Sequence, residues 1–269
     1  MMAMERLDRE IAEVLGLTDK REKDSELFKV FSEVFDKTTV ETISYFYRRG
    51  IIERLYGVLS TGKEANVFAG YNSKGEKIAV KIYRTYTTEF RRIWEYLAAD
   101  PRIGALPKDI RKLVFVWTRR EYKNLQRALK YAVRAPEPIA FRNNVLVMEF
   151  IGDDMPAPRL KDVEKELEKE DFEELYDFMM GSIEKLWKRG DMVHGDLSEY
   201  NLLLWHEPVI IDWSQATVKR NRMSLTLLYR DIRNVINYFK RKGIDVEDPE
   251  EKFRELAGDE LWMRNLRSL

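Results

Sequence analysis

The chain has 269 residues, enough for one large domain or two smaller lobes that bury a sizeable hydrophobic core. Lys and Arg number 47, as do Asp and Glu, so the net charge of zero does not indicate a surface that binds polyanions everywhere. Cysteine is absent and histidine occurs only at His194 and His206, which excludes disulfides and nearly excludes a zinc site. Without a signal peptide or an apolar run of membrane length, we expect a cytoplasmic protein with no membrane partner.

The first fifty residues are expected to be helical. Phenylalanines between residues 28 and 35 recur at spacings of three and four, which places them on one helix face. A second helix follows, with its cap at Thr38 or Thr39 and its end at Gly50. We therefore expect residues 1–54 to be a helical extension that packs on the domain after it.

The next hundred residues are expected to be rich in strands. Short apolar segments separated by turn residues predict strands at 55–60, 65–71, 76–84, 137–141 and 144–150. A helix is predicted over 118–131, before the fourth strand. Residues 85–111 contain two prolines and a glycine, and we expect a flexible insertion there.

The remainder of the chain is predicted to be mostly helical. Residues 151–160 contain a glycine and two prolines, which indicates a hinge between lobes with the break at Gly152. One continuous helix is expected over 161–190. The expected fold is thus an α+β fold of two lobes, with a strand-rich lobe at 55–151 and a helical lobe at 152–269.

The strongest chemical signal is the segment HGDLSEYN at residues 194–201. Asp196 is followed five residues later by Asn201, which is the spacing of a kinase catalytic loop. A carboxylate can accept the proton of an attacking hydroxyl, and an amide oxygen is a neutral ligand for a hard cation. A polar surface turn is the structural alternative for this segment, and Asp231 is expected to brace the loop from within.

A second aspartate follows a short apolar strand. Asp212 ends the segment Val209–Ile211, and kinases place a metal-binding aspartate at such a strand end. Here Trp213 and Ser214 follow it, where kinases have Phe and Gly. An ordinary turn residue is the alternative interpretation of Asp212, but its spacing from the preceding loop favours the metal ligand.

A glycine turn lies between the first two predicted strands. Gly62 would let the backbone approach phosphate oxygens there, so we expect a loop that covers a nucleotide. Residues 57–63 also match most of the P-loop pattern. However, Glu64 stands where a P-loop needs Ser or Thr, and a strand follows where a helix is required, so a P-loop enzyme is not expected.

A lysine on the third predicted strand completes the set of candidate residues. Lys81 follows Ala79 and Val80, the pattern of a strand lysine that contacts the α- and β-phosphates of ATP. Such a lysine needs an acidic partner, and Glu121 in the helix 118–131 is the expected one. The alternative partners nearer in sequence are Glu89 and Glu95.

These four elements, in this order, resemble the RIO family of atypical serine/threonine protein kinases. STGKEANVF at residues 60–68 resembles the type-one subfamily in particular, and REYKNLQRA, VLVMEFIG and HGDLSEYNLLL also match it. The resemblance covers about residues 37–243. It implies a bilobal protein-kinase-like fold with extra N-terminal helices and without a full activation segment.

The resemblance also implies roles for single residues. Lys81 would bind the α- and β-phosphates with Glu121 holding it, and Asp196 would be the catalytic base. Asp212 would both hold Mg²⁺ and accept a phosphate group. The other implied contacts are those of Asn201 with Mg²⁺ and of the backbone of Glu149 and Ile151 with adenine, with Met148 behind them. Whether Mn²⁺ replaces Mg²⁺ stays open.

The implied function is that of an ATP- and Mg-dependent serine/threonine protein kinase with ATPase activity, acting in maturation of the small ribosomal subunit. Its implied partners are ATP and a pre-ribosomal small-subunit particle or its rRNA. A small-molecule phosphotransferase of the aminoglycoside or choline kinase type is the first alternative, because such enzymes also use His-Gly-Asp loops. A nucleotide-gated assembly factor is the second, with RNA contacts at the basic clusters Arg91-Arg92, Arg119-Arg120 and 219–222.

Overall fold

The computed structural model describes residues 14, 36–86 and 90–258 of the chain, and these form two compact units. The described residues of the first unit come from Met1–Glu95, Ala105–Tyr122 and Glu137–Phe150. Those of the second come from Tyr96–Gly104, Lys123–Pro136 and Ile151–Leu269. The helix expected at residues 28–35 lies outside the described residues.

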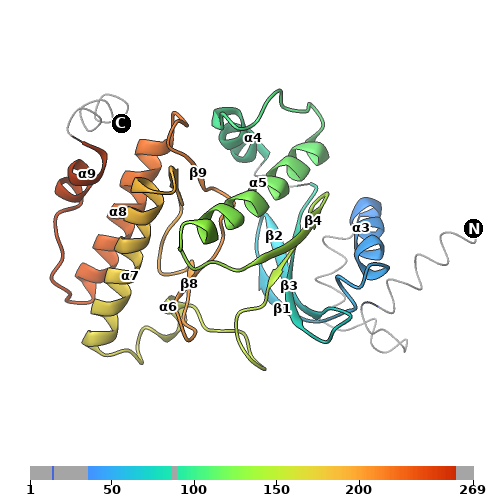
Figure 1. The fold of residues 1–269 in the computed structure, drawn as a ribbon, viewed down its shortest axis with the longest axis horizontal. Helices are drawn as coiled ribbons and strands as arrows, with labels where there is room; N and C mark the ends of the chain where they lie inside the picture. The colour runs from blue at the N-terminus through green and yellow to red at the C-terminus, as the bar shows by residue number, and fades with distance from the viewer. Residues whose placement is uncertain (1–13, 15–35, 87–89, 259–269) are drawn as a thin grey trace, which may run out of the picture. The chain divides into compact units, whose positions relative to one another are not determined.

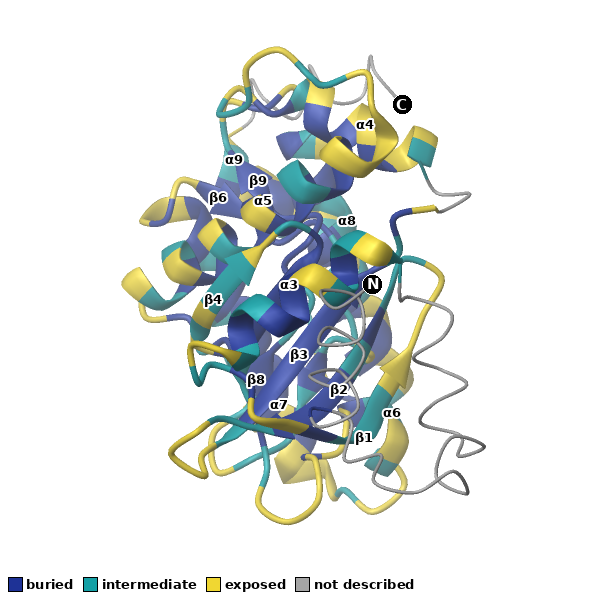
Figure 2. Cartoon of the chain, turned by 90° about the vertical axis from the view of Figure 1, so that its right-hand side faces the viewer, coloured by how far each residue is buried: buried dark blue, intermediate teal, exposed yellow. Residues whose placement is uncertain are grey.

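A five-stranded antiparallel sheet forms the centre of the first unit (Figure 1). Its strands, given in chain order, are β1 (Arg54–Thr61), β2 (Ala65–Tyr71), β3 (Lys77–Tyr83), β4 (Pro138–Arg142) and β5 (Val145–Glu149). Their order in the sheet is β1-β2-β3-β5-β4, so β3 is central and is buried along nearly all of its length, whereas β1 and β4 are edge strands and more exposed (Figure 2). The five predicted strands are all present.

Helix α3 (Lys37–Tyr47) packs against this sheet. Its N-terminal cap is Asp36, whose Oδ1 accepts the Thr39 N–H at 2.8 Å, so the prediction of a threonine cap was wrong. Aspartate caps well because its carboxylate oxygen reaches the unpaired N–H groups of the first turn. Ile43 and Phe46 of α3 are fully or almost fully buried in the core under the sheet, where they join Phe68, Val80 and Val147.

Two helices occupy the segment between β3 and β4. Helix α4 (Phe90–Ala99) lies within residues 85–111, where sequence analysis expected a flexible insertion. Its Ile93 and Leu97 are buried at a spacing of four, on one helix face. The breakers that suggested an insertion, Pro101 and Pro107, both lie beyond the last residue of α4, so they mark the loop after the helix.

The second of these helices, α5 (Ile110–Lys130), begins at Ile110 rather than at Thr118. Its first turns carry β-branched and aromatic residues, which have low helix propensity. Leu113, Val114 and Trp117 are nevertheless buried on one side. Burial of that side outweighs the modest propensity cost, and the helix extends by two turns.

The helix expected over residues 161–190 is broken in two. The structure contains α6 (Leu160–Val163) and α7 (Lys169–Lys188). Glu168 caps α7, because its side chain accepts an N–H of the first turn while Asp171 accepts the Glu168 N–H at 2.9 Å. This reciprocal capping box fixes a new helix start inside a charged run whose periodicity alone looks continuous.

Three helices pack side by side in the second unit: α7, α8 (Ser224–Arg241) and α9 (Pro249–Ala257). The Nε1–H of Trp187 on α7 donates to the backbone oxygen of Leu256 on α9 at 2.9 Å. Helix α9 begins after Asp248, whose carboxylate accepts two backbone N–H groups of its first turn. None of the helices in the described part of the chain is both long and apolar enough to cross a membrane.

Two small antiparallel sheets flank residues 194–201 and the segment that contains Asp212 in the second unit. They pair β6 (Met192–Val193) with β9 (Thr217–Val218), and β7 (Leu202–Leu203) with β8 (Val209–Ile210). Residues 194–201 run from β6 to β7, and Asp212 follows β8 after one residue. The sheets thus fix both ends of the predicted catalytic loop and the start of the predicted metal-binding segment.

Candidate active site

A buried ion pair lies beside the central strand of the first unit. Lys81 on β3 is 8% exposed, and its Nζ lies 2.8 Å from Oε1 of Glu121 on α5, whose side chain is 2% exposed. The hydroxyl of Tyr83 donates to the other carboxylate oxygen of Glu121. A buried ammonium is tolerated when a well-bonded carboxylate faces it, so Glu121 fixes the position of the Lys81 head group. Of the alternative partners, Glu95 pairs with Arg91 at 3.4 Å, and Glu89 lies outside the described residues.

Gly62 lies in the turn between β1 and β2, as the sequence predicted. Its N–H donates to the Ala65 oxygen at 3.0 Å and to Oδ1 of the buried Asn66 at 3.3 Å. A Cβ at this position would lie 3.1 Å from the Ala65 oxygen, a tight contact with backbone. The turn therefore favours a residue without a side chain at this point.

The last residue of β5, Glu149, and Ile151 just beyond the strand are the two residues expected at adenine. The Glu149 N–H donates to the Glu137 oxygen at 2.8 Å, and the Glu149 carboxylate accepts the Glu137 N–H at 3.0 Å. The Ile151 oxygen accepts the Ala157 N–H at 2.9 Å. These bonds engage one backbone group of each residue: the N–H of Glu149 and the carbonyl of Ile151.

In the second unit, Asp231 braces the loop at residues 194–201 from the core, as the sequence analysis expected. Its two carboxylate oxygens accept the N–H groups of Gly195 at 2.7 Å and Leu197 at 2.9 Å. Burial raises the pKa of Asp231 to about 7, although these two donors favour the carboxylate. Gly195 has φ of +83°, and a Cβ there would lie 3.3 Å from the Gln215 oxygen, which explains a glycine between His194 and Asp196.

Two further residues hold the carboxylate of Asp196, and sequence analysis missed both. Gln215 donates from Nε2 to Oδ2 of Asp196 at 2.9 Å, and an Arg230 nitrogen lies 3.8 Å from Oδ1. The amide of Gln215 is itself oriented, because its oxygen accepts from the Tyr96 hydroxyl at 2.7 Å and from Arg230 at 2.8 Å. Neither residue was a candidate from the sequence, and the structure brings both to the loop.

Asn201 and the strand before Asp212 are joined by hydrogen bonds. The Ile211 N–H donates to the Asn201 backbone oxygen at 3.0 Å, and the Asn201 side-chain amide donates to the Asp196 backbone oxygen at 2.8 Å. His194 closes the base of the loop, since its Nδ1 accepts the Asp196 N–H at 3.3 Å and its Nε2 lies 3.1 Å from the Ile211 oxygen. A neutral imidazole protonated at Nε2 satisfies both contacts.

Asp212 has a left-handed backbone conformation, with φ of +60°. Aspartate tolerates this region better than most residues, at a cost of about 1 kcal/mol. Trp213, which stands where kinases have Phe, is fully buried, and its Nε1–H donates to the Ile210 oxygen at 2.8 Å. The His194 ring packs edge-on against the indole, with 4.7 Å between centroids. The loop at residues 194–201 and the Asp212 segment are therefore anchored to each other through His194 and Trp213.

Comparison with known proteins decides the family. The family model of the RIO domain matches residues 66–252. The chain belongs to the RIO family. The RIO-type serine/threonine-protein kinase Rio1 of Haloferax volcanii is 41% identical over 243 residues, which cover 89% of this chain and 81% of that protein. The protein of the same name from Methanocaldococcus jannaschii is 36% identical over 257 residues, covering 95% and 86%.

A solved RIO-family structure has the same fold. The Rio2 kinase of Chaetomium thermophilum, solved as an ADP/Mg²⁺-phosphoaspartate complex, aligns with a TM-score of 0.59 at 18% identity and covers 82% of this chain and 67% of its own. The predicted resemblance to the type-one RIO subfamily and the predicted kinase-like α+β fold are both confirmed.

Proposed function

We propose that this chain is a magnesium-dependent atypical serine/threonine protein kinase that transfers the γ-phosphoryl group of ATP. The observation that carries the proposal is the environment of Asp196. Gln215 holds its carboxylate, and Asp231 fixes the backbone on both sides of it. A base held in this way is positioned for proton transfer before a substrate arrives. The names of the relatives support the same activity.

In this mechanism Asp196 accepts the proton of a serine or threonine hydroxyl, and the hydroxyl oxygen forms a bond to the γ-phosphorus. The bond from the γ-phosphorus to the bridging oxygen breaks, and ADP leaves. ATPase activity would use Asp212 instead, whose carboxylate oxygen attacks the γ-phosphorus to give an aspartyl phosphate that water then hydrolyses. The resemblance to type-one RIO proteins supports this second route and a role in maturation of a pre-ribosomal small-subunit particle.

Lys81 would hold the α- and β-phosphates, since Glu121 fixes its ammonium group. Adenine needs one donor and one acceptor from the backbone. As the resemblance implies, adenine would contact the backbone of Glu149 and Ile151. The turn at Gly62 would cover the phosphates.

The described residues also fit a magnesium ion. Mg²⁺ usually takes one or two protein oxygens and completes its octahedron with waters and substrate phosphates. Asn201 uses its amide nitrogen to bind the Asp196 backbone, so the amide oxygen is the group it has for a metal. Asn201 and the carboxylate of Asp212 would therefore hold the ion, which supplies neutralisation of phosphate charge when bound.

Two substitutions test the proposal. Asp212→Ala should abolish turnover of ATP, and Asp196→Ala should lower phosphorylation of a protein substrate by about 10²–10⁴-fold, the usual contribution of a general base, while nucleotide still binds. Calorimetric titration with ATP and Mg²⁺ measures binding, and hydroxylamine sensitivity separates aspartyl phosphate from serine phosphate. Full activity in either variant would contradict the assignment.

A small-molecule phosphotransferase is the competing proposal, because the His-Gly-Asp form at residues 194–196 is also found in aminoglycoside and choline kinases. Membership of the RIO family favours a protein kinase. Phosphate transfer from ATP that occurs only with an amino sugar or choline, and not with protein, would favour the competing class.

A further inference from the structure

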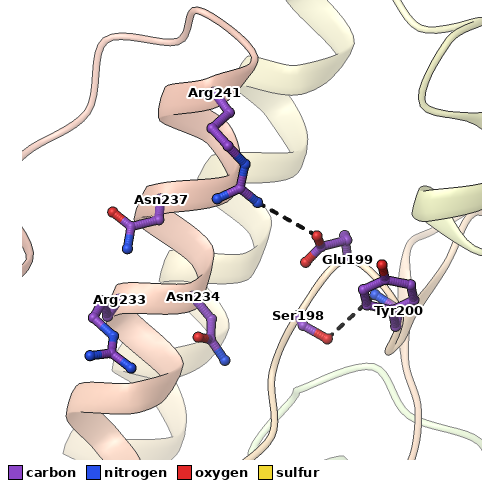
Figure 3. Close-up of a pocket in the computed structure, with 7 residues that line it drawn as sticks. All are labelled: Ser198, Glu199, Tyr200, Arg233, Asn234, Asn237 and Arg241. Atoms are coloured by element: carbon purple, nitrogen blue, oxygen red, sulfur yellow. Dashed lines mark hydrogen bonds and ion pairs between the residues drawn. The ribbon is translucent and has the colours of Figure 1, made fainter.

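A polar pocket adjoins the predicted catalytic loop in the second unit. It has a volume of about 510 Å³ and lies between the loop and helix α8 (Figure 3). Its lining residues are Ser198, Glu199 and Tyr200 from the loop, and Arg233, Asn234, Asn237 and Arg241 from α8. The volume is within the range of ligand-binding pockets. None of the chemistry proposed above uses these side chains.

The pocket is close to the proposed base because its wall is made by the same loop. Ser198 follows Asp196 by two residues, and two residues of extended chain span at most about 7 Å. On the opposite wall, the Asn234 side chain donates to the Leu197 oxygen at 3.4 Å, which ties α8 to the residue after Asp196. A chain segment lying in the pocket would therefore reach the proposed base within a few residues.

Two arginines line the pocket, and they differ in whether a described carboxylate faces them. Arg241 lies 3.7 Å from Glu199, so these two charges largely compensate (Figure 3). Arg233 has no carboxylate within salt-bridge distance in the described part of the chain, and its guanidinium lies 5.9 Å from the centroid of the Tyr229 ring. Among the described residues, Arg233 is thus the one cation of the pocket lining that no carboxylate faces.

The remaining groups suit a polypeptide. Asn234 and Asn237 each carry an amide donor and an amide acceptor, which is the pair of groups that a peptide backbone also presents. Tyr200 is 50% exposed and offers a ring to an apolar side chain. Carboxylates form strong, paired hydrogen bonds with guanidinium groups, so one acidic side chain matches Arg233.

We propose that this pocket binds the acceptor polypeptide and that Arg233 selects acceptors with an acidic side chain near the phosphorylated serine or threonine. This rests on the proposed kinase function and adds the substrate class. Single-stranded RNA is the other polyanion to consider. An RNA backbone presents a row of phosphates and binds a row of cations, whereas Glu199 cancels one of the two arginines here. The balance of charge therefore favours a peptide.

The experiment uses the whole chain and two sets of serine peptides, in which one aspartate or one lysine is moved a single position at a time. Wild-type protein should prefer an aspartate at one or two positions by about tenfold in kcat/KM, mainly through KM, as expected for one charge-assisted contact. Arg233→Glu should lose this preference and should instead prefer lysine at the same positions. The matched control is Lys240→Glu, an exposed residue of α8 outside the pocket, which should keep the wild-type preference.

ATP turnover without peptide distinguishes a failure of the proposed acceptor pocket from a failure of the proposed kinase activity. It should be equal in wild type and Arg233→Glu, which shows that the variant is folded and that the site works. Equal phosphorylation of all peptides by an active wild type would refute the role of Arg233 and leave the kinase proposal intact. A wild type that never turns over ATP would refute both. Competition by a single-stranded oligonucleotide that Arg233→Glu abolishes, with no peptide preference, would assign the pocket to RNA.

Discussion

Replacing Asp231 by asparagine tests how the catalytic loop is braced. Asp231 is 1% exposed, and its environment raises its pKa from 3.8 to about 7. A folded-state pKa above the unfolded one means that the native protein binds this proton more tightly. The contribution of Asp231 to the free energy of unfolding is therefore complete below about pH 4 and is lost as the pH rises through 7. At 1.36 kcal/mol per pH unit, the loss over this interval is about 4 kcal/mol.

Asp231→Asn removes the titration while keeping the shape of the side chain. Urea denaturation followed by tryptophan fluorescence, repeated at steps between pH 4 and 8, gives the free energy of unfolding of both proteins. The wild-type value minus the variant value should fall by up to about 4 kcal/mol between pH 4 and 7 and should then level off. Taking the difference cancels the titration of all groups that the two proteins share.

The opposite slope would refute the reasoning. Two forces act on Asp231: burial favours the neutral acid, and the N–H groups of Gly195 and Leu197 favour the carboxylate. If the two donors outweighed burial, the native pKa would lie below 3.8, and the wild-type advantage would grow as the pH rises from acid. A slope of that sign would mean that the loop is held by a permanently charged brace.

Two further predictions concern the proposed site. Glu121→Gln removes the carboxylate that lies 2.8 Å from the buried Lys81 ammonium, so the free energy of unfolding should fall by about 3 kcal/mol and the KM for ATP should rise about tenfold. Adding Lys81→Met should restore part of the stability in urea denaturation but none of the activity, and a double variant as unstable as Glu121→Gln would contradict this. Gln215→Ala should lower kcat about tenfold at unchanged KM for ATP, because it removes the side chain that donates to Asp196. An unchanged kcat in steady-state assays would show that Gln215 does not position the base.

Most of the sheet could be predicted because its information is local. Alternating apolar segments and turn residues give β2 its full span, and the turn at Asn143 has the left-handed conformation, φ of +49°, that asparagine tolerates. Two of the errors occurred where helix ends depend on capping. Asp36 and Glu168 both begin helices at places where periodicity alone gives no boundary.

The candidate site likewise contains residues that the sequence indicated and residues that only the structure revealed. Asp196, Asn201 and Asp212 became candidates because kinases carry these side chains at short spacings along the chain, and their roles stay predictions. Gln215 and Arg230 could not be identified in this way. Their contacts with Asp196 and with each other join residues that are 15 or more positions apart along the chain.

The geometry of the loop explains why a glycine is needed between His194 and Asp196. With Gly195 at φ of +83°, the N–H groups of Gly195 and Leu197 both reach the carboxylate of Asp231. The backbone on each side of Asp196 is thereby fixed to the core through α8. The side chain of Asp196 is then held separately by Gln215. With its backbone and its side chain both fixed, the proposed base loses little conformational freedom when substrate binds. Such preorganisation lowers the activation free energy without any rearrangement during the reaction.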